Sequence, residues 1–298
     1  MLSLHTNAAS LSTQNALGRT HSELSTSLAR LGTGYRVNSA MDDAAGLQIA
    51  SRMEAQTRGM GVAMRNAQNA ISMMQTAEGA FNEVSNILLR MKDLATQAAD
   101  GTATATDQAS MQSEYDEMGK ELNNIMKNTS FNGQALLTAG GTGTGTGTGT
   151  LAVAAGIKFQ IGATAAEQMT AVLATPLNAL DAAITAASAQ YVTPAAAAGT
   201  ELTAAGSANA EITKLNTALD AVGTMRAALG ANSNRLEHVY NNLSNISTNT
   251  TQARGRIMDV DYATETANMT SKQMMMQAGT SMLKQSSSLS QLVMSLMQ

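Results

Sequence analysis

Two pairs of neighbouring aspartates are the residues of this sequence whose types and spacing could most easily do chemistry. Asp42 stands next to Asp43, and Asp259 lies two residues before Asp261. Paired carboxylates can serve as general acid and base when their pKa values are pushed apart. The same residue types are favoured at helix starts, where they accept hydrogen bonds from free backbone N–H groups. Helix-forming residues follow both pairs, so we favour helix capping over catalysis.

Histidine and cysteine offer no competing site. The three histidines, His5, His21 and His238, are far apart and have no companion at the spacing of a metal site. The sequence has no cysteine, which excludes disulfides, thiolate ligands and cysteine nucleophiles together. The motifs of zinc peptidases, α/β-hydrolases and P-loop proteins are also absent. We therefore expect no metal, no cofactor and no catalytic residue, and we predict that the chain is not an enzyme.

The composition narrows the class of protein further. Of the 298 residues, 44% are hydrophobic but only 3% are aromatic, so Ala, Met and Leu supply an apolar surface that favours helices. A net charge of -4 argues against a nucleic-acid or anionic-membrane partner, because either needs a basic patch. No apolar run approaches the ~18 residues that span a bilayer. The first ten residues lack the features of a cleaved signal peptide, so we expect any export to proceed without one.

The elements that would position these residues are long helices, because apolar residues recur every seventh position in four segments. The residues that show this period are Leu17, Leu24 and Leu31, with Leu28 beside them; Met53, Met60, Ala67, Met74, Phe81, Leu88 and Ala95; Leu215, Val222, Leu229, Leu236 and Leu243; and Met275, Met282, Leu289 and Leu296. The second segment predicts a helix from about Ala44 to Ala99, roughly 80 Å long at ~1.5 Å per residue. The third segment supplies its antiparallel partner. This pattern predicts a mainly α fold built around a long antiparallel coiled-coil-like helical rod.

The middle of the chain is less regular. A shorter helix is expected around Met111 to Ile125, followed by a hairpin turn at Phe131-Asn132-Gly133 and a short strand over Lys158 to Gly162. Five consecutive Gly-Thr pairs occupy Gly141 to Thr150, and we interpret them as an exposed loop because they cannot build a packed core. The Ala- and Thr-rich stretch from roughly 175 to 207 shows little period beyond one short helical patch.

Both ends of the chain carry apolar stripes, although ordinary chain ends are polar and frayed. Leu283, Leu292 and Val293 reinforce the carboxyl-terminal stripe. The two stripes imply that the ends pair with each other, with other subunits, or both. Since each stripe alone has little partner surface, we expect both arms to become helical only in a polymer.

Several motifs resemble the bacterial flagellin family. The amino-terminal signature is matched by Asn38-Ser39-Ala40-Met41-Asp42-Asp43-Ala44-Ala45-Gly46-Leu47-Gln48-Ile49-Ala50, and the hairpin segments by Phe131-Asn132-Gly133 and Phe159-Gln160-Ile161-Gly162-Ala163. The carboxyl-terminal signature is matched by Asn234-Arg235-Leu236-Glu237 and Arg256-Ile257-Met258-Asp259-Val260-Asp261-Tyr262-Ala263. The resemblance covers roughly residues 1 to 173 and 206 to 298.

The resemblance implies a secreted, extracellular structural subunit that self-assembles into the flagellar filament used for motility, with terminal helices that pair in the polymer. The expected organisation is an inner-tube helix over 1–40, an amino-terminal rod part with β-hairpins over 41–175, a short variable surface segment over 176–205, a rod helix over 206–255 and a second inner-tube helix over 256–298. Expected partners are further copies of the chain, an export chaperone and cap or junction proteins. The expected polymerisation residues are Leu17, Leu24, Leu28, Leu31, Met275, Met282, Leu283, Leu289, Leu292, Val293 and Leu296.

A second implied partner is a vertebrate immune receptor. The segment Leu89 to Gln97 resembles the flagellin patch bound by Toll-like receptor 5, with Arg90, Leu94 and Glu114 at matching positions. The same segment can also be interpreted as a polymer contact. Two other classes of protein stay open at this point: a hook-filament junction protein, and a secreted type III tip or translocator protein.

The Gly-Thr repeat gives a first prediction. Deleting Gly141 to Thr150 should leave filament assembly intact, because Gly-Thr pairs bury little surface and demand no unique backbone. Elongation of short filament seeds, followed by electron microscopy, measures this. A deleted chain that stays folded yet cannot polymerise would contradict the interpretation of the repeat as an exposed loop.

Overall fold

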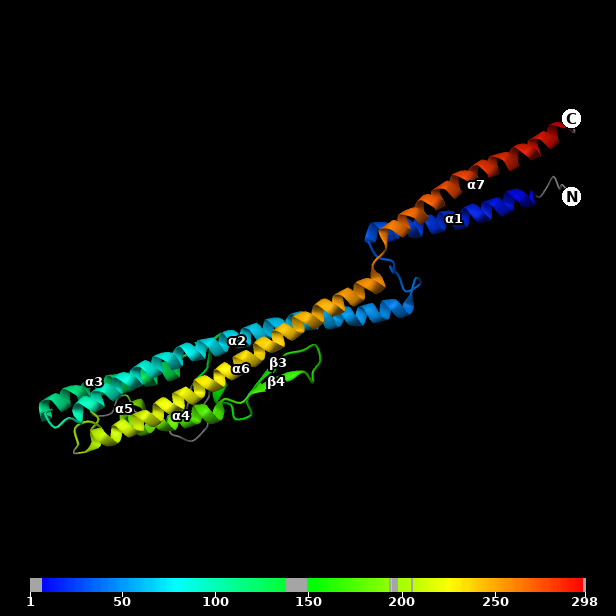
Figure 1. Ribbon diagram of the computed structural model, residues 1–298. Helices are drawn as coiled ribbons and strands as arrows, with labels where there is room; N and C mark the ends of the chain where they lie inside the picture. The colour runs from blue at the N-terminus through cyan, green and yellow to red at the C-terminus, as the bar shows by residue number, and fades with distance from the viewer. Residues whose placement is uncertain (1–6, 138–148, 193, 195–197, 205, 297–298) are drawn as a thin grey trace. The chain divides into compact units, whose positions relative to one another are not determined.

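The computed structural model describes residues 7–137, 149–192, 194, 198–204 and 206–296, with side chains as far as Ser288. Helices dominate it, which confirms the predicted fold class (Figure 1). The helices are α1 (Ala8–Thr33), α2 (Ala44–Ala98), α3 (Ala105–Asn128), α4 (Ala174–Ala187), α5 (Ala189–Val192), α6 (Ser207–Met258) and α7 (Tyr262–Leu296), with a 3₁₀ turn η1 (Thr150–Ala152). Two antiparallel hairpins pair β1 (Ser130–Phe131) with β2 (Gln134–Ala135) and β3 (Ile157–Gln160) with β4 (Gln168–Ala171).

The chain divides into two compact units. The first comprises Met1–Thr57 and Thr248–Gln298, and the second comprises Arg58–Ser247. Both divisions fall inside long helices, α2 and α6, so each of these helices contributes one end to each unit. The two units are described separately below.

The second unit is organised by the seam between α2 and α6, which confirms the predicted antiparallel pairing. Met74, Phe81 and Leu88 of α2 are fully buried, as are Leu229 and Leu236 of α6. As residue numbers rise on α2 they fall on α6, as shown by two shared apolar clusters and one ion pair: Met60 with Leu243, Ala67 with Leu236, and Glu78 with Arg226. The heptad positions predicted from sequence therefore form this core.

Local signals explain the elements that follow α2. Thr104 and Asp107 form a capping box at the start of α3, with the Asp107 backbone N–H donating to Thr104 Oγ1 at 3.3 Å and the Thr104 N–H donating to Asp107 Oδ2 at 3.1 Å. Asn132 and Gly133 link β1 to β2 with φ of 51° and 76°. Two consecutive residues with positive φ are what a two-residue hairpin turn requires.

The segment 176–205 differs from its expected role as a variable surface segment. Leu177, Leu180 and Ile184 on α4 are fully buried, and Tyr191 on α5 is nearly so. All four residues belong to the same apolar cluster as the α2–α6 seam. The short helical patch expected in this stretch corresponds to α4, but its burial was not predicted, because alanine occurs on both its buried and exposed sides and obscures the apolar period that marks a packed face.

The end of the Gly-Thr repeat also differs from expectation. Residues 141–148 lie outside the described residues, but Gly149 is buried and the Thr150 hydroxyl donates to the Ala135 carbonyl at 3.1 Å. The next residue, Leu151, is 1% exposed within the main apolar cluster. The last Gly-Thr pair therefore belongs to the folded unit, and the shorter deletion of residues 141–148 is the cleaner version of the test above.

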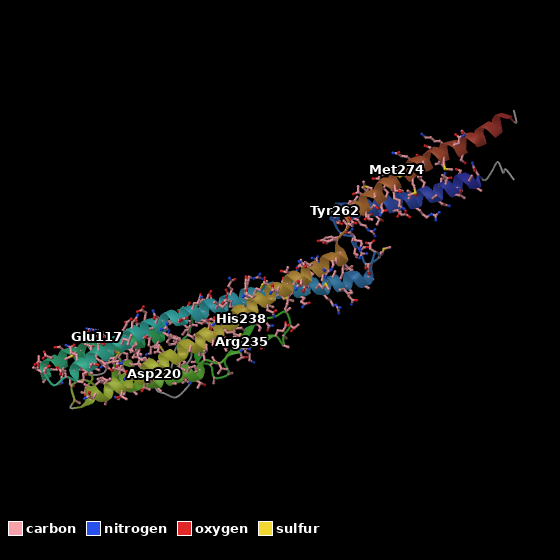
Figure 2. All side chains as sticks on the ribbon, viewed as in Figure 1. Glu117, Asp220, Arg235, His238, Tyr262 and Met274 are labelled. Carbon is pink, nitrogen blue, oxygen red and sulfur yellow. The ribbon has the colours of Figure 1, made fainter. Side chains whose placement is uncertain are left out.

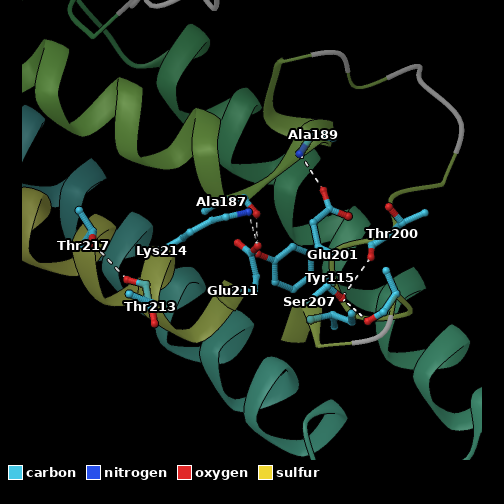
Figure 3. Close-up of polar contacts among 12 residues, drawn as sticks. Tyr115, Ala187, Ala189, Thr200, Glu201, Ser207, Glu211, Thr213, Lys214 and Thr217 are labelled. Carbon is cyan, nitrogen blue, oxygen red and sulfur yellow. Dashed lines mark hydrogen bonds and ion pairs between the residues drawn. The ribbon is translucent and has the colours of Figure 1, made fainter. Parts of the chain in front are cut away.

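Buried polar contacts hold α4 and α5 against α3 and α6 (Figure 3). The Tyr115 hydroxyl lies 2.7 Å from the Ala187 carbonyl oxygen and 3.0 Å from Glu211 Oε1. Glu211 also pairs with Lys214 at 2.9 Å, and burial raises the pKa of its carboxyl. A hydroxyl has one proton, so it can donate to only one of these two oxygens. A proton on Glu211 would let both contacts be hydrogen bonds, so this network is better satisfied in acid.

Asp181 on α4 gives a cleaner pH prediction. Its residue is 3% exposed, its Oδ1 accepts a hydrogen bond from the Tyr191 hydroxyl at 2.6 Å, and burial raises the pKa of its carboxyl above the ordinary 3.8. When folding raises the pKa of a carboxyl, the contribution of that group to stability is fully present below its unfolded-state pKa. This contribution is lost as the pH rises through the folded-state pKa. Wild-type stability should therefore contain a component that falls between about pH 4 and neutrality.

Asp181→Asn should remove that component, because asparagine keeps the acceptor for Tyr191 but carries no charge. At pH 7 we expect Tm to rise by about 2–4 °C, the shift expected for roughly 1 kcal/mol in a protein of this size. The gap to wild type should close towards pH 4 in thermal melts followed by circular dichroism. Asp220→Asn, at an exposed position of α6, is the matched control (Figure 2). It should change neither the Tm at pH 7 nor the dependence of Tm on pH. Parallel pH profiles for wild type and Asp181→Asn would contradict the assignment.

Candidate functional site

The first unit is built on α1 and α7, which lie side by side and run antiparallel (Figure 1). Three polar contacts join α1 to α7, and as residue numbers rise on α1 the numbers of their partners fall on α7. They are Arg30 Nη1 to Glu265 Oε2 at 3.9 Å, Glu23 with Lys272, and Asn7 Nδ2 donating to Ser286 Oγ at 3.2 Å. The links fix one register along the whole length of α1.

The seam between these two helices is narrow. The apolar side chains along it recur every seventh residue on each helix and are Leu17, Leu24 and Leu31 of α1, and Met269, Met276 and Leu283 of α7. Gly279 permits close approach, because a Cβ at that position would lie 3.2 Å from Leu17 Cδ1. Both arms are helical in the structure, and each helix supplies partner surface to the other.

The structure places the predicted polymerisation residues in three groups. Leu17, Leu24, Leu31 and Leu283 lie on the seam. Leu28, Met275 and Met282 face away from it and are 51%, 47% and 65% exposed. The remaining four belong to α7, but their side chains lie outside the described residues; they are Leu289, Leu292, Val293 and Leu296.

Sequence reasoning missed part of this surface. Leu11 and Met274 are 60% and 61% exposed and extend the exposed apolar residues along both helices (Figure 2). It also missed Met269 as a seam residue. The signal was available, because Met269, Met276 and Leu283 are themselves seven residues apart, but the neighbouring heptad through Met275 and Met282 looked equally apolar.

Backbone contacts at the base of the first unit fix where α1 ends and α7 begins. Gly34 ends α1 with φ of 77°, and its carbonyl accepts from the Val260 N–H at 3.0 Å. The Arg36 guanidinium donates to the Ile257 carbonyl at 2.8 Å, and Tyr35 forms an isolated bridge with Asp259. The chain therefore enters and leaves this region through paired backbone rather than through free loops.

The two aspartate pairs have structural roles. Asp43 Oδ1 accepts from the Gly46 N–H at 2.8 Å and caps α2, while Asp261 caps α7 by accepting from the Thr264 hydroxyl and the Ala263 N–H. These bonds, with Thr264 the larger contributor, lower the pKa of Asp261. Capping is thus confirmed for one member of each pair.

The other two aspartates are not helix caps, and that part of the prediction was wrong. Asp42 Oδ2 accepts from the Ser39 and Asn38 N–H groups at 2.9 and 3.1 Å, and these bonds lower the pKa of its carboxyl. It closes a turn before α2. Asp259 lies in the backbone bridge with Tyr35.

The three proposed receptor residues are not equivalent. Arg90 on α2 donates from Nε and Nη2 to Glu114 Oε1 on α3, at 2.9 and 2.7 Å, and both side chains are about half exposed. Leu94 is 2% exposed and belongs to the core cluster of the second unit. Leu94 therefore cannot offer a surface to a partner in this conformation. Leu89, which directly precedes Arg90, is 48% exposed.

Other candidate sites are weak. His21 and His238 are exposed, and His5 lies outside the described residues. Within the described part of the chain, no group of three potential metal ligands comes together. In the same residues, no helix combines the length and the apolarity needed to cross a membrane. A groove of about 540 Å³ between α2 and α6 is lined mostly by amides and hydroxyls, with Glu237 as its carboxylate.

Comparison with known proteins gives matches at both ends of the chain. The model of the bacterial flagellin N-terminal helical region matches residues 4–142, and that of the bacterial flagellin C-terminal helical region matches residues 212–297. Flagellin A of Vibrio anguillarum is 34% identical over 377 aligned positions that cover both chains completely. Polar flagellin C of Vibrio parahaemolyticus is 33% identical over 383 positions, again across both chains. These alignments exceed 298 positions, so both relatives carry segments that this chain lacks.

Comparison with solved structures also gives matches. A putative flagellar hook-associated protein from Vibrio parahaemolyticus aligns with a TM-score of 0.53 and 16% identity, covering 73% of this chain and 100% of that one. At this identity the match shows the fold alone. The crystal structure of Bacillus cereus flagellin is 33% identical over 60% of this chain and 88% of its own, with a TM-score of 0.43.

The full-length relatives do not favour the junction-protein and translocator alternatives. With both terminal helical regions matched and relatives above 30% identity along the whole chain, this protein belongs to the bacterial flagellins, is a structural subunit of the flagellar filament, and is not an enzyme.

Proposed function

We propose that the exposed apolar side chains of α1 and α7 are the contacts through which one subunit joins the next. The observation that supports this most directly is their position: Leu11, Leu28, Met274, Met275 and Met282 are 47–65% exposed on helices that already pair with each other. Fully burying one such side chain contributes ~1.5–3 kcal/mol. With about half of each surface still exposed, the five could contribute on the order of 5 kcal/mol before the costs of association.

The organisation that follows assigns 1–40 and 256–298 to the inner tube of the filament. Residues 41–175 and 206–255 form the surrounding shell, with 176–205 between them. Because α4 and α5 in this middle segment are packed against the core, we expect substitutions there to be tolerated at exposed positions such as Ala182 and Ala186. The subunit is secreted and acts outside the cell in motility, with an export chaperone and cap or junction proteins as transient partners. A chaperone would cover the same methionine-bearing face of α7 before export.

The carboxyl-terminal arm can be tested by truncation. A chain ending at Gln273 keeps every core residue of the second unit but loses Met274, Met275 and Met282. Circular dichroism should show a second unit that is still folded and melts near the wild-type temperature, while elongation of filament seeds is abolished. Normal filaments from this truncated chain would contradict the assignment of α7 to assembly.

We further propose that Arg90 and Glu114 form part of a patch recognised by vertebrate Toll-like receptor 5. The supporting observation is the exposed two-point hydrogen bond between them, which holds the Arg90 guanidinium in one orientation on the surface. Arginine is frequent among residues that dominate binding energy. Leu89 replaces Leu94 as the apolar neighbour, since only Leu89 is exposed.

Substitutions at Arg90 and Leu94 distinguish a residue that contacts the receptor from a residue of the core. Arg90→Ala should weaken receptor signalling by about 2 kcal/mol, roughly 30-fold in potency, if Arg90 is an anchor. Leu94→Ala should instead cost ~2–5 kcal/mol of stability, because it leaves a cavity in the core. A reporter assay on soluble monomer and a thermal melt measure the two effects. Glu117→Ala, exposed on α3, is the control. Unchanged potency for Arg90→Ala would remove this patch from the receptor proposal.

A further inference from the structure

The methionines of this chain fall into two chemically different groups. The sequence contains 21 of them. Met74, Met91 and Met225 in the second unit are 0% exposed. On α7, Met274, Met275 and Met282 are 61%, 47% and 65% exposed, so their side chains are open to solvent in the free subunit (Figure 2). We refer to these three as the α7 methionines.

The α7 methionines lie away from the side of α7 that faces α1. Met275 and Met282 are seven residues apart and therefore nearly eclipsed along the axis, while Met274 is rotated from Met275 by about 100° in the direction away from Met276. Glu265, Met269, Met276 and Leu283 are all less exposed and define the side that faces α1. About half or more of the surface of each α7 methionine is open in the free subunit, and a contact with another copy of the chain would bury it.

An exposed thioether is open to a specific reaction. Its sulfur attacks one oxygen of a peroxide, a sulfur–oxygen bond forms, the O–O bond breaks and water leaves. The sulfur is oxidised by two electrons and the peroxide is reduced. The product, methionine sulfoxide, is polar and chiral. The two methionine sulfoxide reductases return it to methionine with two electrons from a dithiol, which becomes a disulfide while the sulfoxide oxygen leaves as water. Buried methionines are protected because the oxidant cannot reach them.

We propose that the α7 methionines are a reversible oxidation site for peroxides, at which sulfoxide formation stops a free subunit from joining the filament. This inference rests on the proposed role of the exposed α7 side in assembly. A sulfoxide on that side places a strong hydrogen-bond acceptor where the contact with another copy requires an apolar surface. Once the contact forms, the same sulfurs are enclosed, so a finished filament resists the oxidant that disables the free chain.

The experiment treats full-length monomer and finished filaments with hydrogen peroxide and follows each methionine by peptide mass spectrometry. In the monomer, the α7 methionines should gain oxygen at least several-fold faster than Met74, Met91 and Met225. In filaments this difference should shrink. Oxidised monomer should elongate filament seeds several-fold more slowly, and treatment with both reductases and a dithiol reductant should restore elongation.

Two variants make the test specific. Replacing the α7 methionines by leucine conserves the volume and the apolar character of the surface, so this variant should elongate seeds before and after peroxide. Met41→Leu is the matched control, because Met41 is 97% exposed in the turn before α2, outside the α7 surface. That variant should stay as sensitive to peroxide as wild type.

The outcomes separate this inference from the assembly proposal. Wild-type chain that carries sulfoxide at all three α7 methionines yet elongates normally would overturn the oxidation site. Loss of elongation by the leucine variant after peroxide, to the same extent as wild type, would overturn it too. A variant with glutamine at the three positions, tested without peroxide, probes assembly alone. If it elongated like wild type, the α7 surface would not be an assembly contact, and the proposed function would fail first.

Discussion

The close packing of α2 against α6 governs what the other elements of the second unit can do. Alanines at Ala63, Ala67 and Ala77 have at most 1% of their surface exposed, so small side chains fill part of the seam and the helices can approach closely. Larger residues such as Phe81 and Leu88 belong to a cluster that also takes in side chains of α3 and α4. The helical pair therefore acts as the support onto which the hairpins and the middle segment pack.

The same seven-residue period gives a different result in the first unit. Two helices without further cover cannot enclose a core, and along α1 and α7 only Leu24, Ser27 and Glu265 are buried among the residues whose side chains are described. The apolar residues on the outer sides remain open to water. This exposed apolar surface suits a filament subunit, because other copies of the chain can bury it.

Four aspartates of this chain secure helix ends and turns. Asp43, Asp107 and Asp261 accept hydrogen bonds at helix starts, and Asp42 closes the turn before α2. Each carboxylate is consumed by nearby backbone or hydroxyl donors, which leaves no pair poised to exchange protons with a substrate. Asp181 and Glu211 differ from these four, because burial rather than capping controls their carboxylates. The hydrogen bond from the Tyr115 hydroxyl to the Ala187 carbonyl, at the end of α4, ties the middle segment to the helical core.

Periodicity and local chemistry in the sequence were enough to determine the long helices, the antiparallel α2–α6 pairing and the Asn132-Gly133 turn, and the resemblance of its motifs to those of flagellins indicated the family. Those features depend on residues close in sequence or on a pattern repeated many times, so each is specified redundantly. Tertiary structure alone decided which of two adjacent stripes on α7 faces α1. Consecutive residues are rotated by about 100° around a helix, so Met275 and Met276 are equally apolar but point in different directions. The same reasoning applies to Leu94 and to α4: burial is a property of the neighbours, and the sequence of one segment does not contain them.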